Sequence, residues 1–175
     1  MHRTLHRQWS IRAEKQTGTD PLAIRASQEI RAGGFRGVPR IASRKAGGRK
    51  LRHAIEVRHD SFKIPEFVAL ARKYNAAIVY AHHEKYPAIA DVTADFVYAR
   101  LQQAAPKIET GYSAPALKKW AEAARVWSEG KAPKDLPTYG KAAKPAKTDV
   151  FIYFISGAKE RNPAAAMALL RELKK

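Results

Sequence analysis

The segment Ala77-Ile78-Val79-Tyr80-Ala81 is an almost unbroken apolar run. Such a run is typical of a strand that is covered on both faces, as in a parallel sheet packed between other elements. A stretch that begins at Pro65 precedes it, with apolar residues at helical spacing, and Asn75 ends that stretch. A helix that leads directly into a buried strand favours the α/β class.

The same alternation continues on both sides of this run. Residues 54–58, 96–101 and 150–155 are predicted strands, and residues 113–127 and 162–173 are predicted helices, the last with Asn162 as its N-cap and Pro163 in its first turn. Strands that alternate with helices imply a parallel sheet with the helices packed outside it. We therefore expect an α/β fold with four parallel strands, either an open sheet or part of a (β/α)8 barrel, whose complete form needs about 250 residues.

Composition sets the broad class. The chain has 175 residues, of which 45% are hydrophobic and 28% are charged. It contains no cysteine, which excludes disulfides, thiolate catalysis and cysteine-ligated metal sites. No apolar run reaches the roughly 18 residues of a membrane span, and the first residues have no apolar core of a secretory signal. We expect a cytoplasmic globular protein with no membrane partner.

The net charge of +17 is unevenly distributed. Residues 1–52 hold 13 Lys and Arg against 3 Asp and Glu, so that less than a third of the chain carries +10. Residues 1–46 have no sustained helical or strand period, and residues 31–37 are rich in arginine and glycine. We expect a basic, irregular segment over residues 1–46. Its charge favours polyanions such as nucleic acids.

Several motifs occur in order along the rest of the chain. They are His53–Phe62, Asp91–Leu101, Gly111-Tyr112, Leu117 with Trp120-Ala121, and Val150–Phe154. In these motifs the chain resembles the domain of unknown function 72 family, the YecE-like TIM-barrel proteins, from about Gly47 to Lys175. The resemblance implies that residues 47–175 are the C-terminal half of a (β/α)8 barrel with no established activity, and that the four strands are its fifth to eighth.

The family's fourth-strand motif, a Gly-Pro pair followed by Trp-Gln, is absent from residues 1–46. Residues 34–43 can be encoded so that the reading frame shifted by one base gives DFEAFLASL, an amphipathic helix. Residues 18–34 can be encoded so that the shifted frame restores the missing motif. We therefore predict that residues 5–43 are an out-of-frame reading of the family's fourth β/α unit, which the codons around Leu22 and Ala23 would decide.

Candidate site residues lie where the predicted strands end, the functional edge of barrel enzymes. Glu56 and Arg58 are two residues apart and share one strand face, while Ile55 and Val57 face the helices. A buried Glu–Arg pair and a ligand-binding pair are equally good interpretations. His59 follows directly and is a candidate base or metal ligand, with a turn-capping role as the alternative.

The other candidates end the later strands. His82 shares a face with Ile78 and Tyr80, and no second cluster beside it points to zinc. Arg100 shares a face with Tyr98 and is suited to hold a phosphate or carboxylate. Ser156 and Lys159 precede the last helix, where an anion or simple capping is expected.

Three functions remain open at this point. The first is residual binding of an anionic or phosphorylated ligand by a truncated barrel. The second is non-specific nucleic-acid binding through the basic surface, and the third is a fragment without function. A half barrel has open edges, so self-association is also expected. The sequence identifies no reaction, metal or cofactor, and the tryptophans and the Lys131–Lys147 stretch are expected to be helix packing and a solvated, mobile loop.

Overall fold

A computed structural model describes residues 12–13, 22–26, 45–46 and 49–175 of the chain. The elements from residue 53 onward follow the predicted order. The strands are β5 (His53–Val57), β6 (Ala76–His82), β7 (Phe96–Leu101) and β8 (Asp149–Phe154). The helices are α1 (Pro65–Lys73), α2 (Ala114–Ser128) and α3 (Asn162–Leu173). Each predicted helix and strand is therefore confirmed to within a few residues.

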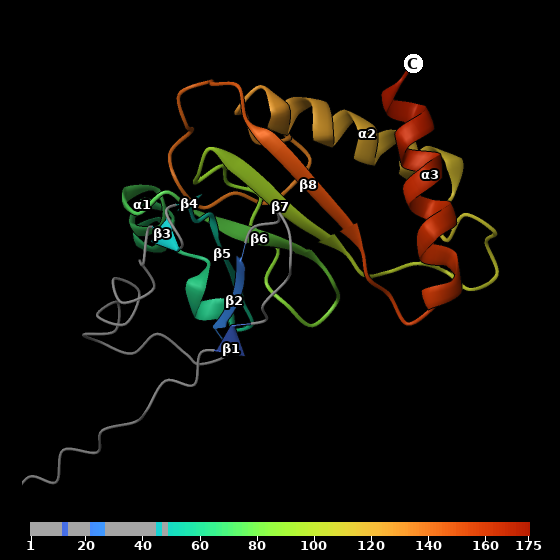
Figure 1. Cartoon of the computed structure of the whole chain (residues 1–175), viewed down its shortest axis with the longest axis horizontal. Helices are drawn as coiled ribbons and strands as arrows, with labels where there is room; N and C mark the ends of the chain where they lie inside the picture. Colours follow the sequence, from blue (N-terminus) through green and yellow to red (C-terminus); the bar gives the residue numbers. More distant parts are fainter. Residues whose placement is uncertain (1–11, 14–21, 27–44, 47–48) are drawn as a thin grey trace, which may run out of the picture.

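The strands form one sheet in which β5, β6, β7 and β8 are neighbours in the order of the sequence, all parallel. Figure 1 shows this order, with α1 on the left of the view and α3 on the right. Each step to the next strand passes through a helix or a long loop, as parallel pairing requires. The sheet is open, which is compatible with part of a (β/α)8 barrel.

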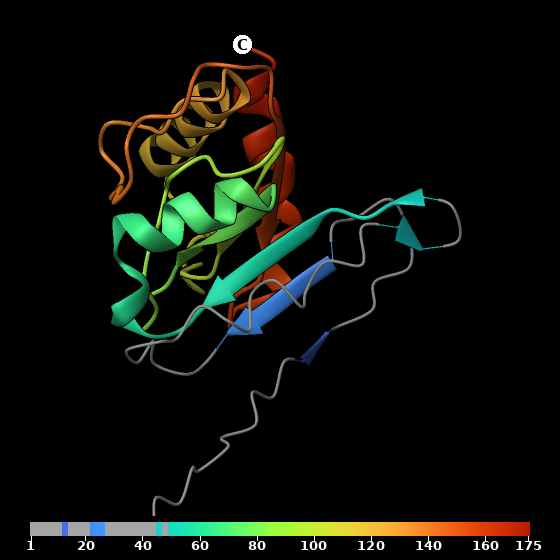
Figure 2. The ribbon, with the colours of Figure 1, turned by 90° about the vertical axis from the view of Figure 1, so that its left-hand side faces the viewer.

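All three helices cover the same face of the sheet (Figure 2). Phe67, Val68 and Ala71 of α1 pack with Ile55 and Ile78. Farther along, Leu117, Trp120 and Trp127 of α2 and Leu169 of α3 pack with residues of β6 and β7. Because each strand alternates its side chains, the opposite face collects a separate set. That set comprises Ala54, Ala77, Val79, Phe96 and Tyr98, with Phe151 and Tyr153 beside them.

This one-sided winding distinguishes the fold from doubly wound α/β sheets, which carry helices on both faces. In a (β/α)8 barrel the helices form an outer ring and the bare face turns inward. We call the face that lacks the helices the inner face and the other face the outer face. The predicted orientation of Ile55 and Val57 toward a helix is confirmed.

The chain before residue 53 adds strands that its side-chain pattern does not predict. β2 (Leu22–Ala26) pairs with β5 in parallel over five residues, and β1 (Arg12–Ala13) pairs with β2 in antiparallel fashion. β3 (Lys45–Ala46) and β4 (Arg49–Lys50) form a separate pair. A ladder consists of backbone hydrogen bonds, which need no apolar period. The predicted arginine–glycine segment at residues 31–37 lies outside the described residues.

Two further expectations differ from the structure. The Lys131–Lys147 stretch keeps its lysines in solvent, but its backbone makes contacts that were not expected: the N–H of Ala146 donates to the carbonyl of Glu129, and Arg72 donates to the carbonyl of Lys141. The loop is therefore hydrogen-bonded to the rest of the protein near its end and in its middle, and its mobility stays a prediction. Asn162 is already helical rather than an N-cap, and its side chain accepts from the Ser156 hydroxyl at 2.8 Å.

Candidate functional site

The inner face carries a buried carboxylate between two guanidinium groups at the end of the sheet where the strands terminate. Glu56 of β5 is 1% exposed. Its Oε1 accepts from Nε and Nη2 of Arg58 at 3.0 and 2.9 Å, while its Oε2 accepts from Nη1 of Arg100 on β7. The sequence predicted all three residues as candidates, and the structure brings them together.

The electrostatics of this cluster leave one positive charge in excess. Burial alone would raise the pKa of Glu56, but the hydrogen bonds and charges of Arg100 and Arg58 outweigh it and lower the pKa below its usual value. The carboxylate is therefore ionised at neutral pH and balances one guanidinium. Of the described side chains that bond Glu56, two are guanidinium groups, and one carboxylate balances only one of them.

The register of the sheet explains how residues on non-adjacent strands meet. Ile55 lies opposite Ile78, and Arg100 lies opposite Ala81. Continuing the β5–β6 register by three residues places Arg58 level with Ala81 as well. The two arginines therefore flank a strand position that carries only a methyl group, and both reach down to Glu56 one level below.

A tyrosine and a histidine from the loop after β6 form a wall beside Arg58. Nη1 of Arg58 donates to the Tyr86 hydroxyl at 3.1 Å, and the guanidinium lies 4.4 Å from the ring centroid. The His83 ring stacks on Tyr86 at 4.3 Å between centroids. Sequence reasoning considered His83 only beside His82 as a zinc ligand and missed Tyr86, because an aromatic residue in a loop has no periodic signal.

A polar pocket of about 380 Å³ opens next to this wall. Its lining consists of Arg58, His59, Asp60, Lys63, Glu84, Lys85 and Tyr86. His59 is the N-cap of a short 3₁₀ turn, and its Nδ1 accepts from the backbone N–H of Ser61 at 3.2 Å. Lys63 pairs with Asp60 at 2.8 Å. The pocket and the Glu56 cluster share Arg58, which connects them into one candidate site.

The remaining sequence candidates lie elsewhere. His82 is on the outer face, where its ring meets Trp120 edge-on at 4.9 Å, and burial followed by the nearby His83 lowers its pKa. Ser156 is buried, and its hydroxyl hydrogen-bonds Asn162 at the start of α3. Lys159 is exposed in the turn before α3. None of the three contacts the Glu56 cluster in the part of the chain that the structure describes.

The described residues contain no group of three or more His, Asp or Glu side chains arranged to hold a metal ion. The acidic residues near the other end of the strands serve the fold instead. Asp91 accepts from the backbone N–H groups of Tyr139 and Gly140 at 2.8 and 3.0 Å and pairs with Arg72 at 3.6 Å. It thereby fixes the loop that leads to β8.

Together, the fold and the site define an α/β protein with a one-sided sheet and a cationic cluster at the carboxyl end of its strands. A family model for proteins of unknown function, DUF72, matches residues 31–175, and the chain belongs to this family. The match begins earlier than the Gly47 boundary expected from the motifs. No curated protein and no solved structure matches the chain.

Among the described residues, no helix combines the length and the apolar character that crossing a membrane requires.

Proposed function

We propose that the carboxyl end of the sheet binds a small anionic ligand, such as a phosphate or carboxylate group, through Arg58 and Arg100. The observation that carries this proposal is that two guanidinium groups, those of Arg58 and Arg100, meet at the single carboxylate of Glu56. An unbalanced buried cation is unfavourable, so a second anion stabilises it. Barrel-type sheets place their ligands at this end of the strands.

The hydrogen-bond donors of the two arginines support the proposal that the ligand is an anion. Among the described residues, the side chain of Arg100 donates only through Nη1, which leaves the other nitrogens of its fork for a ligand. Arg58 keeps a side-chain exposure of 27%, so its outer edge is accessible. Two planar forks held by one carboxylate are already oriented before a ligand arrives, which reduces the entropy lost on binding.

The test uses two arginines that bracket the same strand. Arg58 follows β5, whereas Arg52 precedes it, pairs with Asp149 at 2.6 Å and has a similar side-chain exposure of 31%. Inorganic phosphate is titrated into the full chain and followed by heteronuclear NMR shifts. We expect Arg58→Gln to weaken binding about tenfold, since each hydrogen bond to a charged group contributes roughly 1.5–3 kcal/mol. Arg52→Gln should leave the affinity unchanged.

Two results would overturn this function. An equal loss of phosphate affinity in both variants would mean that phosphate responds only to the overall positive charge of the protein. Absence of any phosphate-dependent shift in the unaltered chain would favour a fragment without a ligand.

A second candidate function is binding of a polyanion such as nucleic acid, favoured by the anchored loop. Five lysines project into solvent from it: Lys131, Lys134, Lys141, Lys144 and Lys147. Hydrogen bonds at Lys141 and Ala146 tie the backbone of this loop to the rest of the protein. Binding to duplex DNA should then fall with salt, with a log–log slope of about −0.9 for each phosphate that the lysines neutralise. Lys141→Glu with Lys144→Glu should make that slope shallower, and an unchanged slope would exclude the loop.

A further inference from the structure

β8 is at the edge of the sheet that the described residues form, and half of its backbone hydrogen-bonding groups face away from β7. The N–H of Asp149 bonds the carbonyl of Asp95, and the N–H of Ile155 bonds that of Leu101. In a parallel ladder every second residue points both of its groups to the same neighbour. Residues 149, 151, 153 and 155 therefore bond β7, and the N–H and C=O groups of Val150, Ile152 and Phe154 point outward.

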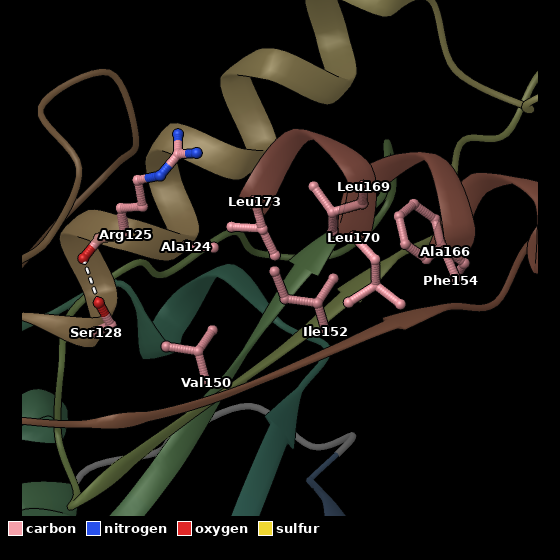
Figure 3. Close-up of a pocket in the computed structure, with 10 residues that line it drawn as sticks. All are labelled: Ala124, Arg125, Ser128, Val150, Ile152, Phe154, Ala166, Leu169, Leu170 and Leu173. Carbon is pink, nitrogen blue, oxygen red and sulfur yellow. Dashed lines mark hydrogen bonds between the residues drawn. The ribbon is translucent and has the colours of Figure 1, made fainter. Parts of the chain in front are cut away.

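The same three residues line an apolar groove on the outer face (Figure 3). The groove has a volume of about 400 Å³ and lies between β8, α2 and α3, as the close-up shows. Leu169, Leu170 and Leu173 of α3 and Ala124 of α2 complete most of its lining. Leu170 and Met167 of α3 remain 57% and 56% exposed. An apolar groove beside a free strand edge is a surface that natural proteins usually cover.

We propose that this surface is the interface of a homodimer in which β8 pairs with β8 of a second copy in antiparallel fashion, around a two-fold axis at Ile152. This proposal goes beyond the anion site and does not depend on it. With the axis at Ile152, that residue lies opposite its own copy, and Val150 lies opposite the copy's Phe154. All outward-facing groups of both strands then pair, giving six hydrogen bonds across the axis.

The side chains are also self-complementary in this register. Val150 meets Phe154 and Ile152 meets Ile152 on the outer face, which joins the two apolar grooves into one strip. The only charged residue of the strand, Asp149, lies opposite position 155 of the copy, an isoleucine, so no like charges face each other. A two-fold interface requires a patch that matches itself, and this register supplies one.

Exposed apolar side chains of α3 would add to the proposed dimer contact beside the paired β8 strands. Met167 and Leu170 are two of the three large apolar side chains that stand exposed among the described residues, and the third, Ile155, directly follows β8. Leu170 lines the groove and Ile155 follows β8, so two of these three exposed side chains lie at the edge that the proposed dimer covers. This concentration favours a second protein copy over a small ligand, which would fill the groove but leave the strand edge unpaired.

Because the chain has no cysteine, one engineered thiol reports the register directly. Cα atoms of a hydrogen-bonded antiparallel pair are about 5.5 Å apart, within the range that a disulfide bridges. The two copies of position 150 would be about 13 Å apart along the strands, too far for a bridge. We expect mild oxidation of Ile152→Cys to give a covalent dimer and the same treatment of Val150→Cys to give none.

Sedimentation of the full chain provides the independent measurement. We expect a mass twice that of the 19.5 kDa chain, and a monomer for Leu170→Glu. Ala114→Glu adds the same charge at an exposed position of α2 and should remain a dimer. A monomer at every concentration, equal crosslinking at positions 150 and 152, or a monomer that takes up an apolar dye in the groove would overturn the proposal.

Discussion

Arg100 on β7 donates a hydrogen bond to the buried carboxylate of Glu56 on β5, although β6 runs between the two strands. On β6, Ala81 lies opposite Arg100 and is fully buried, so the strand between the two arginines carries only a methyl group at this level. A larger residue at this position would occupy the space that the guanidinium crosses. The candidate site therefore depends on a small side chain that carries no functional group itself.

Replacement of Ala81 by leucine should break this contact. We expect Ala81→Leu to lower the free energy of unfolding by about 1–3 kcal/mol, since added methylene groups in a packed interior force neighbours to move. Urea denaturation at neutral pH measures the change. Ala142→Leu, at an exposed position, is the matched substitution and should have little effect. An Ala81→Leu variant as stable as the unaltered chain would contradict the packing described here.

Removal of the carboxylate should be more severe and should respond to anions. Glu56→Gln leaves two guanidinium groups facing each other, and loss of one partner of a buried ion pair costs about 3–5 kcal/mol. Millimolar phosphate should restore part of the decrease in melting temperature, because it supplies the missing negative charge. Glu129→Gln removes an exposed partner of Lys131 and should change stability by less than about 1 kcal/mol. Equal losses of stability for the two variants would contradict the role of Glu56.

The sequence predicted the strands and helices after residue 53 because each leaves a local mark. The apolar run of β6 and the helical spacing of α2 follow from which faces are buried. The grouping of Glu56, Arg58 and Arg100 was also predictable, since two-residue spacing fixes the face and parallel strands end at one edge. Family membership, confirmed over residues 31–175, was visible in the same motifs.

Other features had no local mark. Pairing of β2 with β5 is made by backbone groups, so the side chains of Leu22–Ala26 did not reveal it. Tyr86 reaches Arg58 across 28 residues of sequence, and only the fold brings them together. The anchoring of the lysine-rich loop depends on Arg72, which bonds a main-chain carbonyl 69 residues away. Long-range contacts of this kind are set by topology rather than by composition.

The reading frame of the first residues remains a prediction about the gene. If residues 5–43 are read out of frame, the nucleotides that encode Leu22 and Ala23 contain TGG in the shifted frame, and those for residues 34–43 encode DFEAFLASL there. Sequencing the 5′ part of the gene tests both at once. Codons at Leu22 and Ala23 without TGG would contradict this hypothesis. The basic residues of the segment would then be encoded in the correct reading frame.

Gly130 should be intolerant of any side chain. It follows α2 with φ of +75°, and a Cβ there would lie 2.4 Å from the carbonyl oxygen of Ala146. We expect Gly130→Ala to lower the free energy of unfolding by more than about 1–2 kcal/mol, the cost of the left-handed conformation alone. Gly157 has nothing within 4 Å of its Cβ position, so Gly157→Ala is the control and should be nearly neutral. Similar melting temperatures for both variants would show that the loop moves to accept the methyl group.

His82 should make stability depend on pH above the range in which Glu56 titrates. Burial lowers its pKa from 6.5, and its Nδ1 has no hydrogen-bond partner among the described residues, so the folded state favours the neutral ring. As pH falls below 6.5 the unfolded chain gains a proton first. The stabilisation is therefore full above about 6.5 and is lost as pH falls through the folded pKa, by up to about 1.4 kcal/mol per pH unit. Glu56, whose lowered pKa starts from 4.5, loses its contribution only in more acidic solution.

Melting temperatures between pH 7.5 and 5.5 should fall in the unaltered chain and in His59→Gln, and should fall less in His82→Leu. A His82→Leu variant with an unchanged pH slope would place the titrating group elsewhere.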